Sequence, residues 1–266
     1  MNVRRPDERD HVEIDAGPAA GVSDRGLRHA KNEDAMAVVP LSSAVVAVVC
    51  DGVSSSSRPE EASQAAADTA ARVLAGRVQD GADAAAATRE AVEEAARAVE
   101  ALSTGGTNPP ACTYVSAVID AESVTVGWLG DSRVYWVPAD GLADGKGGEA
   151  AEALTRPAVL TVDDSLGGPE FVSHLLTGWL GADALSTEPH VETFRPGGPG
   201  LVVVCSDGLW NYLRDPAELA AAVSERSGPP LQVAQGLVEL ALERGGHDNI
   251  TVVVVPFPPP AGAESG

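Results

Sequence analysis

The sequence has few aromatic residues, at 4% of its 266 positions, although 44% of the positions are hydrophobic. A core of this composition must consist mainly of Ala, Val and Leu, and the length fits one large domain or two small ones. No apolar run approaches the ~20 residues that a membrane-spanning helix needs. The N-terminal stretch MNVRRPDERDHVEID also lacks the apolar segment of a secretory signal. We therefore expect a cytoplasmic protein with no membrane partner.

Basic residues are scarce as well, since 18 Lys and Arg face 39 Asp and Glu, for a formal net charge of -21. A nucleic-acid-binding surface needs a basic patch, so a nucleic-acid partner is not expected. The acidic excess by itself names no partner. It indicates either a solvated surface that keeps the protein soluble or carboxylates that converge to hold cations.

Cysteine occurs only three times, at Cys50, Cys112 and Cys205, and no two cysteines form a C-x-x-C pair. A structural zinc site is therefore not expected. Cys50 and Cys205 lie within apolar runs, Cys112 opens one, and none has a histidine nearby. The three thiols are interpreted as core residues and not as catalytic nucleophiles.

Apolar runs rich in valine, which favours strands, punctuate most of the chain. They predict strands at about 34–40, 44–50, 111–119, 123–129, 132–137, 201–205 and 249–255. Alanine-rich or amphipathic stretches predict helices at about 59–79, 81–102, 216–226 and 230–243. The helices come in pairs and not singly between strands, which disfavours a parallel β-α-β sheet. The pattern favours an α+β fold of antiparallel sheets with helices packed outside.

The domain organisation follows from the polar ends of the chain. Residues 1–16 are polar and predict a flexible N-terminus, and the Pro-rich residues 257–266 predict a disordered tail. Residues 17–256 show neither an internal repeat nor a linker, and they predict a single domain.

Acidic residues stand at the ends of the predicted strands. Each one alone is explained by a turn, a helix cap or an exposed surface position. Together they would require several independent coincidences, whereas acids that converge on one rim can hold two divalent cations. Oxygen ligands without a histidine cluster indicate Mg or Mn and not Zn. The residues concerned are Glu33, Asp34, Asp51, Asp131, Asp207 and Asp248.

Five motifs carry a resemblance that covers about residues 20–256. In chain order they read SDRGL…NED, VVCDG, GDSR, CSDGLW and DNITVVVV. This order resembles the metal-dependent protein serine/threonine phosphatases of the PP2C type (the PPM family), in particular their bacterial members. The resemblance implies a four-layer αββα sandwich, in which two antiparallel sheets are flanked by antiparallel helix pairs. It also implies a dinuclear Mg²⁺ or Mn²⁺ centre.

The resemblance assigns roles at the two Asp-Gly motifs and at the last strand. Asp51 would bridge both metals, and the carbonyl of Gly52 would bind one of them. Asp207 and Asp248 would hold the other metal. Two cations lower the pKa of a shared water until hydroxide forms near neutral pH, and this hydroxide attacks phosphorus directly. No phosphoenzyme is needed, in agreement with the absence of a candidate nucleophilic cysteine.

Further roles come from the same resemblance. Glu33 and Asp34 would hold metal-bound water or bind a metal directly, and Asn249 would orient Asp248. Asp131 would match the weaker third-metal site of bacterial members.

Two departures from the family pattern concern the substrate. The position of the phosphate-gripping arginine falls on His29, with Arg28 one residue earlier, so either side chain is a candidate for this catalytic role. Many bacterial members have a histidine where this chain has Ser56, and serine is a poor acid for protonating an alkoxide leaving group. Alternatively, residues 54–57 are simply a capping loop before the first helix.

The segment 163–182 looks shorter than the mobile flap of bacterial members. His174 and Trp179 within it are interpreted as packing or flap-surface residues. The sequence thus predicts a phosphatase acting on phosphoserine and phosphothreonine, opposite a Ser/Thr kinase. A related alternative is a hydrolase of small phosphoesters at the same site. The rival is a phosphatase-like protein that binds phosphoproteins without turnover.

Overall fold

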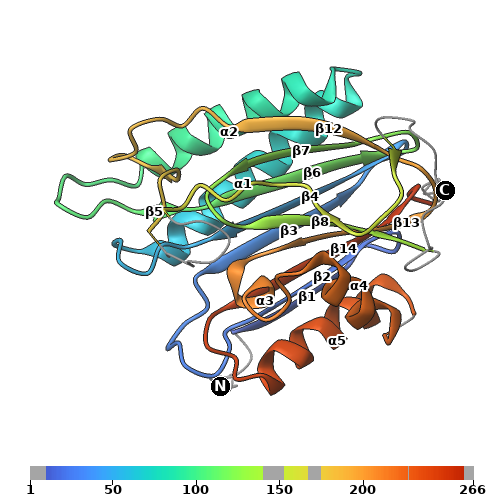
Figure 1. The fold of residues 1–266 in the computed structure, drawn as a ribbon. Coiled ribbons are helices and arrows are strands. Elements are labelled where there is room, and N and C mark those ends of the chain that lie inside the picture. Colours follow the sequence, from blue (N-terminus) through green and yellow to red (C-terminus); the bar gives the residue numbers. More distant parts are fainter. Residues whose placement is uncertain (1–9, 140–152, 167–174, 227, 261–266) are drawn as a thin grey trace, which may run out of the picture.

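The computed structural model describes residues 10–139, 153–166, 175–226 and 228–260. Two six-stranded sheets form its centre (Figure 1). The first has the order β1-β2-β14-β13-β8-β10 and is antiparallel throughout. Its strands are β1 (His11–Asp15), β2 (Ala20–Asp24), β14 (Ile250–Phe257), β13 (Gly200–Cys205), β8 (Arg133–Pro138) and β10 (Ala158–Val159).

The second sheet has the order β3-β4-β6-β7-β12-β9. Its strands are β3 (Asp34–Pro40), β4 (Ala44–Asp51), β6 (Tyr114–Asp120), β7 (Val124–Leu129), β12 (His190–Pro196) and β9 (Ala153–Leu154). The pairing of β12 with β9 is parallel, so this sheet is not purely antiparallel as expected. A separate two-stranded sheet joins β5 (Ala111–Cys112) to β11 (Leu180–Gly181).

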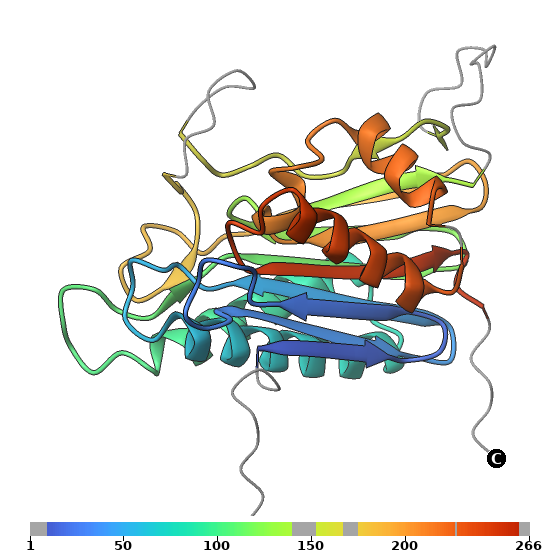
Figure 2. The ribbon, with the colours of Figure 1, turned by 90° about the horizontal axis from the view of Figure 1, so that it is seen from below.

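Helices cover both outer faces of the paired sheets. The second sheet carries α1 (Pro59–Gln79) and α2 (Ala84–Glu100), and the first carries α3 (Asp207–Trp210), α4 (Pro216–Ser224) and α5 (Pro230–Glu243). Viewed from below, α5 lies across β2 and β14 (Figure 2). Helix starts follow local chemistry, since proline opens α1, α4 and α5 and aspartate side chains cap α2 and α4.

The core has three layers of apolar side chains, which explains the continuous valine runs. Along β4, Val46 and Val48 face the helices, whereas Val45 and Val49 face the other sheet. Because side chains alternate along a strand, a strand covered on both faces is apolar at every position. On α1 the buried side chains are mostly alanine, which allows the helix to pack closely on α2 and on the sheet.

Most of the predicted elements match the described ones within a few residues, and the α+β prediction is confirmed. The prediction of a loose N-terminus was wrong at residues 11–15, which form β1, the edge strand of the first sheet. Its sequence HVEID has only two apolar residues in alternation, and four of its five side chains are exposed, so the signal is short and lies within a polar stretch. Strands β2 and β12 were missed too, β12 because it carries His, Glu, Thr and Arg.

The ends of the chain lie partly outside the described residues. Strand β14 extends to Phe257, one residue into the predicted tail, while residues 1–9 and 261–266 are not described. The extent of the domain remains a proposal. Across the described segments, no helix combines the length and the apolar character that crossing a bilayer requires.

Truncating the core under α1 tests this packing. Leu74 is fully buried between the helices and the second sheet, whereas Leu185 is 99% exposed. We expect Leu74→Ala to lower the free energy of unfolding by about 2–5 kcal/mol and Leu185→Ala to change it by less than about 0.5 kcal/mol. Urea unfolding followed by tryptophan fluorescence measures both. Equal effects of the two variants would contradict the assigned core.

Candidate functional site

The predicted acidic residues come together because the strands that carry them are neighbours. Asp34 and Asp51 are register partners across β3 and β4. In the other sheet, Asp207 follows β13, Asp248 precedes β14 and Asp131 precedes β8. Since β13 is antiparallel to both of its neighbours, its C-terminal end lies beside the starts of β8 and β14. All five aspartates therefore lie at one end of the sandwich.

Asp51 lies at the centre of this acidic cluster. Burial, followed by the negative charges of Asp34, Asp207, Asp248 and Asp131, raises its pKa well above the usual value. Four carboxylates thus act electrostatically on one group whose side chain is partly accessible to solvent. A positive charge placed beside a carboxyl group in this setting stabilises its ionised form.

Asp207 experiences the same field from the other sheet. Burial raises its pKa first, and the charges of Asp248, Asp131 and Asp34 raise it further. The side-chain amide of Asn211 donates to Oδ2 of Asp207 at 3.2 Å and opposes this shift, because the hydrogen bond favours the charged form.

Asp34 is held by two hydroxyl groups that the sequence analysis did not identify. Ser206 and Thr251 donate to its Oδ2 at 2.8 and 2.7 Å. Burial nevertheless raises its pKa to about 6. Its Oδ1 is buried and has no hydrogen-bond partner among the described residues. Ser206 directly precedes Asp207 in the CSDG motif and Thr251 belongs to DNIT, so both lay within recognised motifs.

The glycine after each strand-end aspartate is required by close backbone contacts. A Cβ on Gly52 would lie 2.6 Å from the carbonyl oxygen of Glu33, and one on Gly208 would lie 1.9 Å from that of Asn249. Neither contact tolerates a side chain. The Asp-Gly pairs therefore permit the chain segments that carry the acids to approach one another.

Asn249 anchors the loop that carries the first motif. Its Nδ2 donates to the carbonyl oxygens of Arg25 and Lys31 at 2.7 and 3.0 Å, and its Oδ1 accepts from the N–H of Glu33 at 2.8 Å. The contact with Asp248 comes from the backbone, because the N–H of Asn249 donates to Oδ1 of Asp248 at 2.8 Å. The side-chain amide thus positions the loop and not Asp248.

The first motif contributes Glu33 and His29 to the rim of the cluster. The Glu33 carboxylate accepts a hydrogen bond from Ser54 at 2.5 Å, and Nε2 of His29 lies 3.2 Å from Oδ1 of Asp248. Arg28 is exposed and makes no hydrogen bond or ion pair with the residues that the structure describes. Of the two candidates for gripping phosphate, His29 is the one that contacts the acidic cluster.

Two motif residues without a predicted role hold the loop of Asp131. The Arg133 guanidinium forms two hydrogen bonds with Asp163, at 2.9 and 2.7 Å, and stacks 3.8 Å from the ring centre of Trp210. Trp210 in turn donates its indole N–H to the carbonyl oxygen of Asp131 at 2.8 Å. The sequence signal that could have identified these two residues is their place in the motifs GDSR and CSDGLW.

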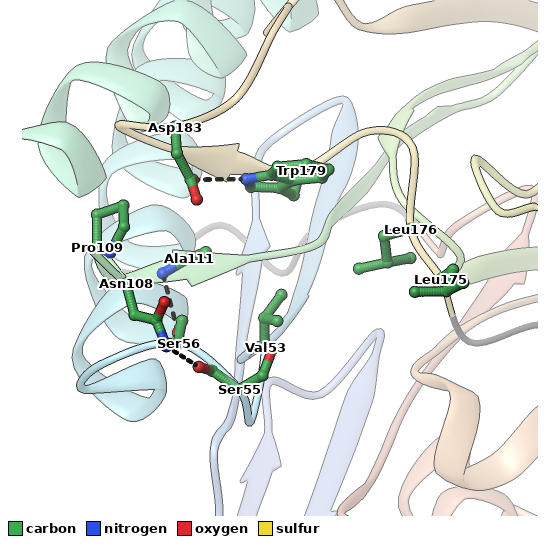
Figure 3. Close-up of a pocket in the computed structure, with 10 residues that line it drawn as sticks. All are labelled: Val53, Ser55, Ser56, Asn108, Pro109, Ala111, Leu175, Leu176, Trp179 and Asp183. Atoms are coloured by element: carbon green, nitrogen blue, oxygen red, sulfur yellow. Dashed lines mark hydrogen bonds between the residues drawn. The ribbon is translucent and has the colours of Figure 1, made fainter.

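A pocket of about 230 Å³ lies at the loop that follows Gly52 in the chain, with Val53, Ser55 and Ser56 on its wall (Figure 3). Ser56 on its wall accepts a hydrogen bond from the N–H of Ala111 at 3.2 Å, which ties this loop to β5. Trp179 also lines the pocket and donates to Asp183 at 3.0 Å. His174 lies outside the described residues. The capping interpretation fails for the serines, because the N-cap of α1 is Arg58, which makes no side-chain cap hydrogen bond.

Comparison with known families matches residues 25–240 to the family model described as Protein phosphatase 2C. The chain belongs to the protein phosphatase 2C family. Human Protein phosphatase 1F is 29% identical over 161 residues, which cover 54% of this chain and 34% of the human protein. An Arabidopsis thaliana protein kinase and PP2C-like domain-containing protein is 26% identical over 177 residues, covering 58% and 25%. The chain spans about a quarter to a third of these relatives.

Solved structures agree with the PP2C fold. The serine/threonine phosphatase Stp1 from Staphylococcus aureus superposes with a TM-score of 0.71 at 20% identity, covering 90% of this chain and 94% of Stp1. The PPM Ser-Thr phosphatase MsPP from Mycobacterium smegmatis, solved in complex with cacodylate, gives 0.66 at 24% identity and covers 90% and 97%. The resemblance found in the sequence is thereby confirmed at the level of family and fold.

The donor set fits hard divalent cations. Five aspartates supply only oxygen, and the buried Oδ1 of Asp34 has no partner among the described residues. Within the described part of the chain, no three acidic, histidine or cysteine side chains are arranged so that they could hold a metal ion together as they stand. The fit therefore rests on charge, proximity and donor type.

Neutralising the central aspartate tests the electrostatics of the cluster. Because folding raises the pKa of Asp51, its ionisation costs stability, and the neutral amide of Asp51→Asn removes that cost. In chelator at pH 7.5 we expect the melting temperature to rise by about 2–4 °C. Added Mn²⁺ should stabilise the wild type and have a smaller effect on the variant. Differential scanning calorimetry measures both effects. The exposed Asp68→Asn is the control, and an unchanged Mn²⁺ effect in Asp51→Asn would contradict the assignment.

Removing the Asn249 side chain tests the loop anchor. Asn249→Ala leaves two carbonyl groups and the N–H of Glu33 without their partners, so we expect a loss of about 1–3 kcal/mol in unfolding free energy. Hydrogen exchange should accelerate selectively in residues 25–33. Asn108→Ala, which removes one exposed hydrogen bond to Ser55, should do neither. Uniform acceleration across the chain would refute a local anchor.

Proposed function

We propose that this chain is a Mg²⁺- or Mn²⁺-dependent phosphatase that hydrolyses phosphoserine and phosphothreonine in proteins. The observation that carries the proposal is the acidic cluster, in which four aspartates act on Asp51 at the end of a PP2C fold. A phosphoprotein substrate, an opposing Ser/Thr kinase and a cytoplasmic location belong to the same proposal. The motifs also support the proposal, because each acid belongs to one of the five motifs and the aspartates lie at one end of the sandwich.

The metal-holding roles follow the positions of the acids. Asp51 would lie between two cations and the carbonyl of Gly52 would bind one of them, while Asp207 and Asp248 approach from the other sheet. Glu33 and Asp34 would complete the centre through water or directly. Asp131 is the candidate for a third, weaker site together with Asp207.

The cations would supply Lewis-acid charge, which makes water acidic enough to act near neutral pH and offsets charge on the phosphoryl group. The chain's own residues would position the reactants. His29, in contact with Asp248, is the favoured residue for orienting the phosphoryl oxygens, and the exposed Arg28 is the second candidate. Asp51 and Asp207, whose pKa values are raised in the cluster, release their protons more readily when cations are bound.

This chain has no assigned general acid to protonate the leaving oxygen. A serine hydroxyl is a poor acid, and Ser56 accepts a hydrogen bond from Ala111 at the wall of the pocket. We infer that substrates with good leaving groups react faster than alkyl phosphoesters. The same feature keeps the rival function open, in which the protein binds phosphoproteins with weak turnover or none.

Hydrolysis assays test the function. With Mn²⁺ or Mg²⁺ we expect turnover of an aryl phosphate and, more slowly, of a phosphothreonine peptide, with none in chelator. Asp207→Asn should reduce kcat by about 100-fold or more, because it removes a charge from the metal centre. Asp215→Asn, an exposed helix cap, is the matched control. Turnover of the aryl ester alone would indicate a missing general acid. No turnover of either substrate, with Mn²⁺ binding intact by calorimetry, would favour the rival.

A further inference from the structure

We propose that the guanidinium of Arg214, in a pocket beside the acidic cluster, binds a second anionic group of the substrate, either an acidic side chain or another phosphoryl group. The inference rests on the proposed phosphatase function. The pocket has a volume of about 300 Å³. It is lined by Gly208, Asn211, Tyr212, Arg214, His247 and Asp248, and we call it the Arg214 pocket.

The Arg214 pocket is continuous with the proposed metal centre. Asp248, a proposed metal ligand, forms part of its wall, and Gly208 directly follows Asp207. A peptide whose phosphorylated residue sits at the acidic cluster would therefore bring its neighbouring residues to this pocket. Because Asp248 belongs both to the acidic cluster and to the wall of this pocket, the second anionic group can belong to the same peptide segment.

Arg214 is positioned by contacts on both sides. Its Nη2 donates to Oδ1 of Asn211 at 3.4 Å, and Nδ2 of Asn211 donates to Asp207 at 3.2 Å. The preceding Leu213 is buried, and the following Asp215 caps α4 by accepting from the N–H of Ala217 at 2.8 Å. The backbone at Arg214 is thus fixed while its side chain is exposed.

Arg214 also has no carboxylate within 4.0 Å among the described residues, although acids outnumber bases 39 to 18 in the sequence. Other arginines, such as Arg58, Arg77 and Arg195, form ion pairs. An arginine without an acidic partner in so acidic a chain is available for a ligand. Its planar guanidinium matches carboxylate and phosphate with two parallel hydrogen bonds.

Tyr212, which lines the pocket, contacts the backbone and ring of His247 and the side chain of Arg244. Its hydroxyl accepts from the N–H of His247 at 3.0 Å, and the two rings lie 6.0 Å apart. Its carbonyl oxygen accepts from Arg244 at 2.7 Å. In a protein with a net charge of -21, the guanidinium of Arg214 would offset part of the repulsion that an acidic phosphopeptide meets at this pocket.

Three phosphothreonine peptides test the proposal. They are identical except for their flanking positions, which carry neutral residues, glutamates, or a non-hydrolysable phosphonate analogue of phosphoserine. We expect kcat/KM of the wild type with Mn²⁺ to be about 3- to 10-fold higher for an anionic peptide than for the neutral one. In Arg214→Gln this ratio should fall to about one, and Arg214→Lys should restore part of it.

Arg195→Gln provides the control, because it removes the same charge from an exposed position on β12 and should leave the ratio unchanged. A preference for glutamate alone would identify an acidic side chain as the ligand, and one for the phosphonate alone a second phosphoryl group. A ratio near one in the wild type, or a preference retained in Arg214→Gln, would overturn the proposal.

Binding separates this inference from the proposed function. If no substrate is hydrolysed, fluorescence anisotropy of a labelled peptide that carries two phosphonates still measures how tightly the peptide binds to the protein. Weaker binding to Arg214→Gln than to wild type and Arg195→Gln would support the pocket while the phosphatase proposal fails. Equal binding to all three proteins would overturn the pocket.

Discussion

Mutual repulsion among closely spaced, buried and half-buried carboxylates is the constraint on which the functional end of this protein depends. Burial and four neighbouring negative charges raise the pKa of Asp51, and Asp207 experiences a similar field. A fold does not gain stability from such an arrangement, because each ionised carboxylate raises the cost of ionising the next. The divalent cations proposed above would relieve this repulsion, and the oxygen donors of the cluster suit Mg²⁺ or Mn²⁺.

Much of the surrounding structure supports this unfavourable cluster. Two glycines let backbones approach where any Cβ would collide, and Ser206 and Thr251 donate to Asp34. The Asn249 amide fixes the loop of the first motif through three hydrogen bonds. The apolar layers provide the rigid base, because strands such as β4 pack against apolar side chains on both faces.

Two pockets near the acidic cluster differ in chemistry. The pocket beyond Gly52 is lined largely by apolar and small polar side chains (Figure 3). The Arg214 pocket presents a guanidinium beside Asp248. In the proposed phosphatase, two pockets of different chemistry would help to select and orient an extended phosphopeptide.

The sequence by itself determined the class of fold, most of the strands and helices, and the identity of the acids, because valine runs and strand-end aspartates are local signals. It did not reveal β1 or β12, whose side chains are mainly polar or exposed and whose pairing is made by the backbone. Only the tertiary structure decided that His29 contacts Asp248, that the Asn249 side chain holds the loop, and that Arg214 faces a pocket next to Asp248. These contacts join residues that lie far apart in the chain or on separate loops, and no local pattern encodes which of them meet.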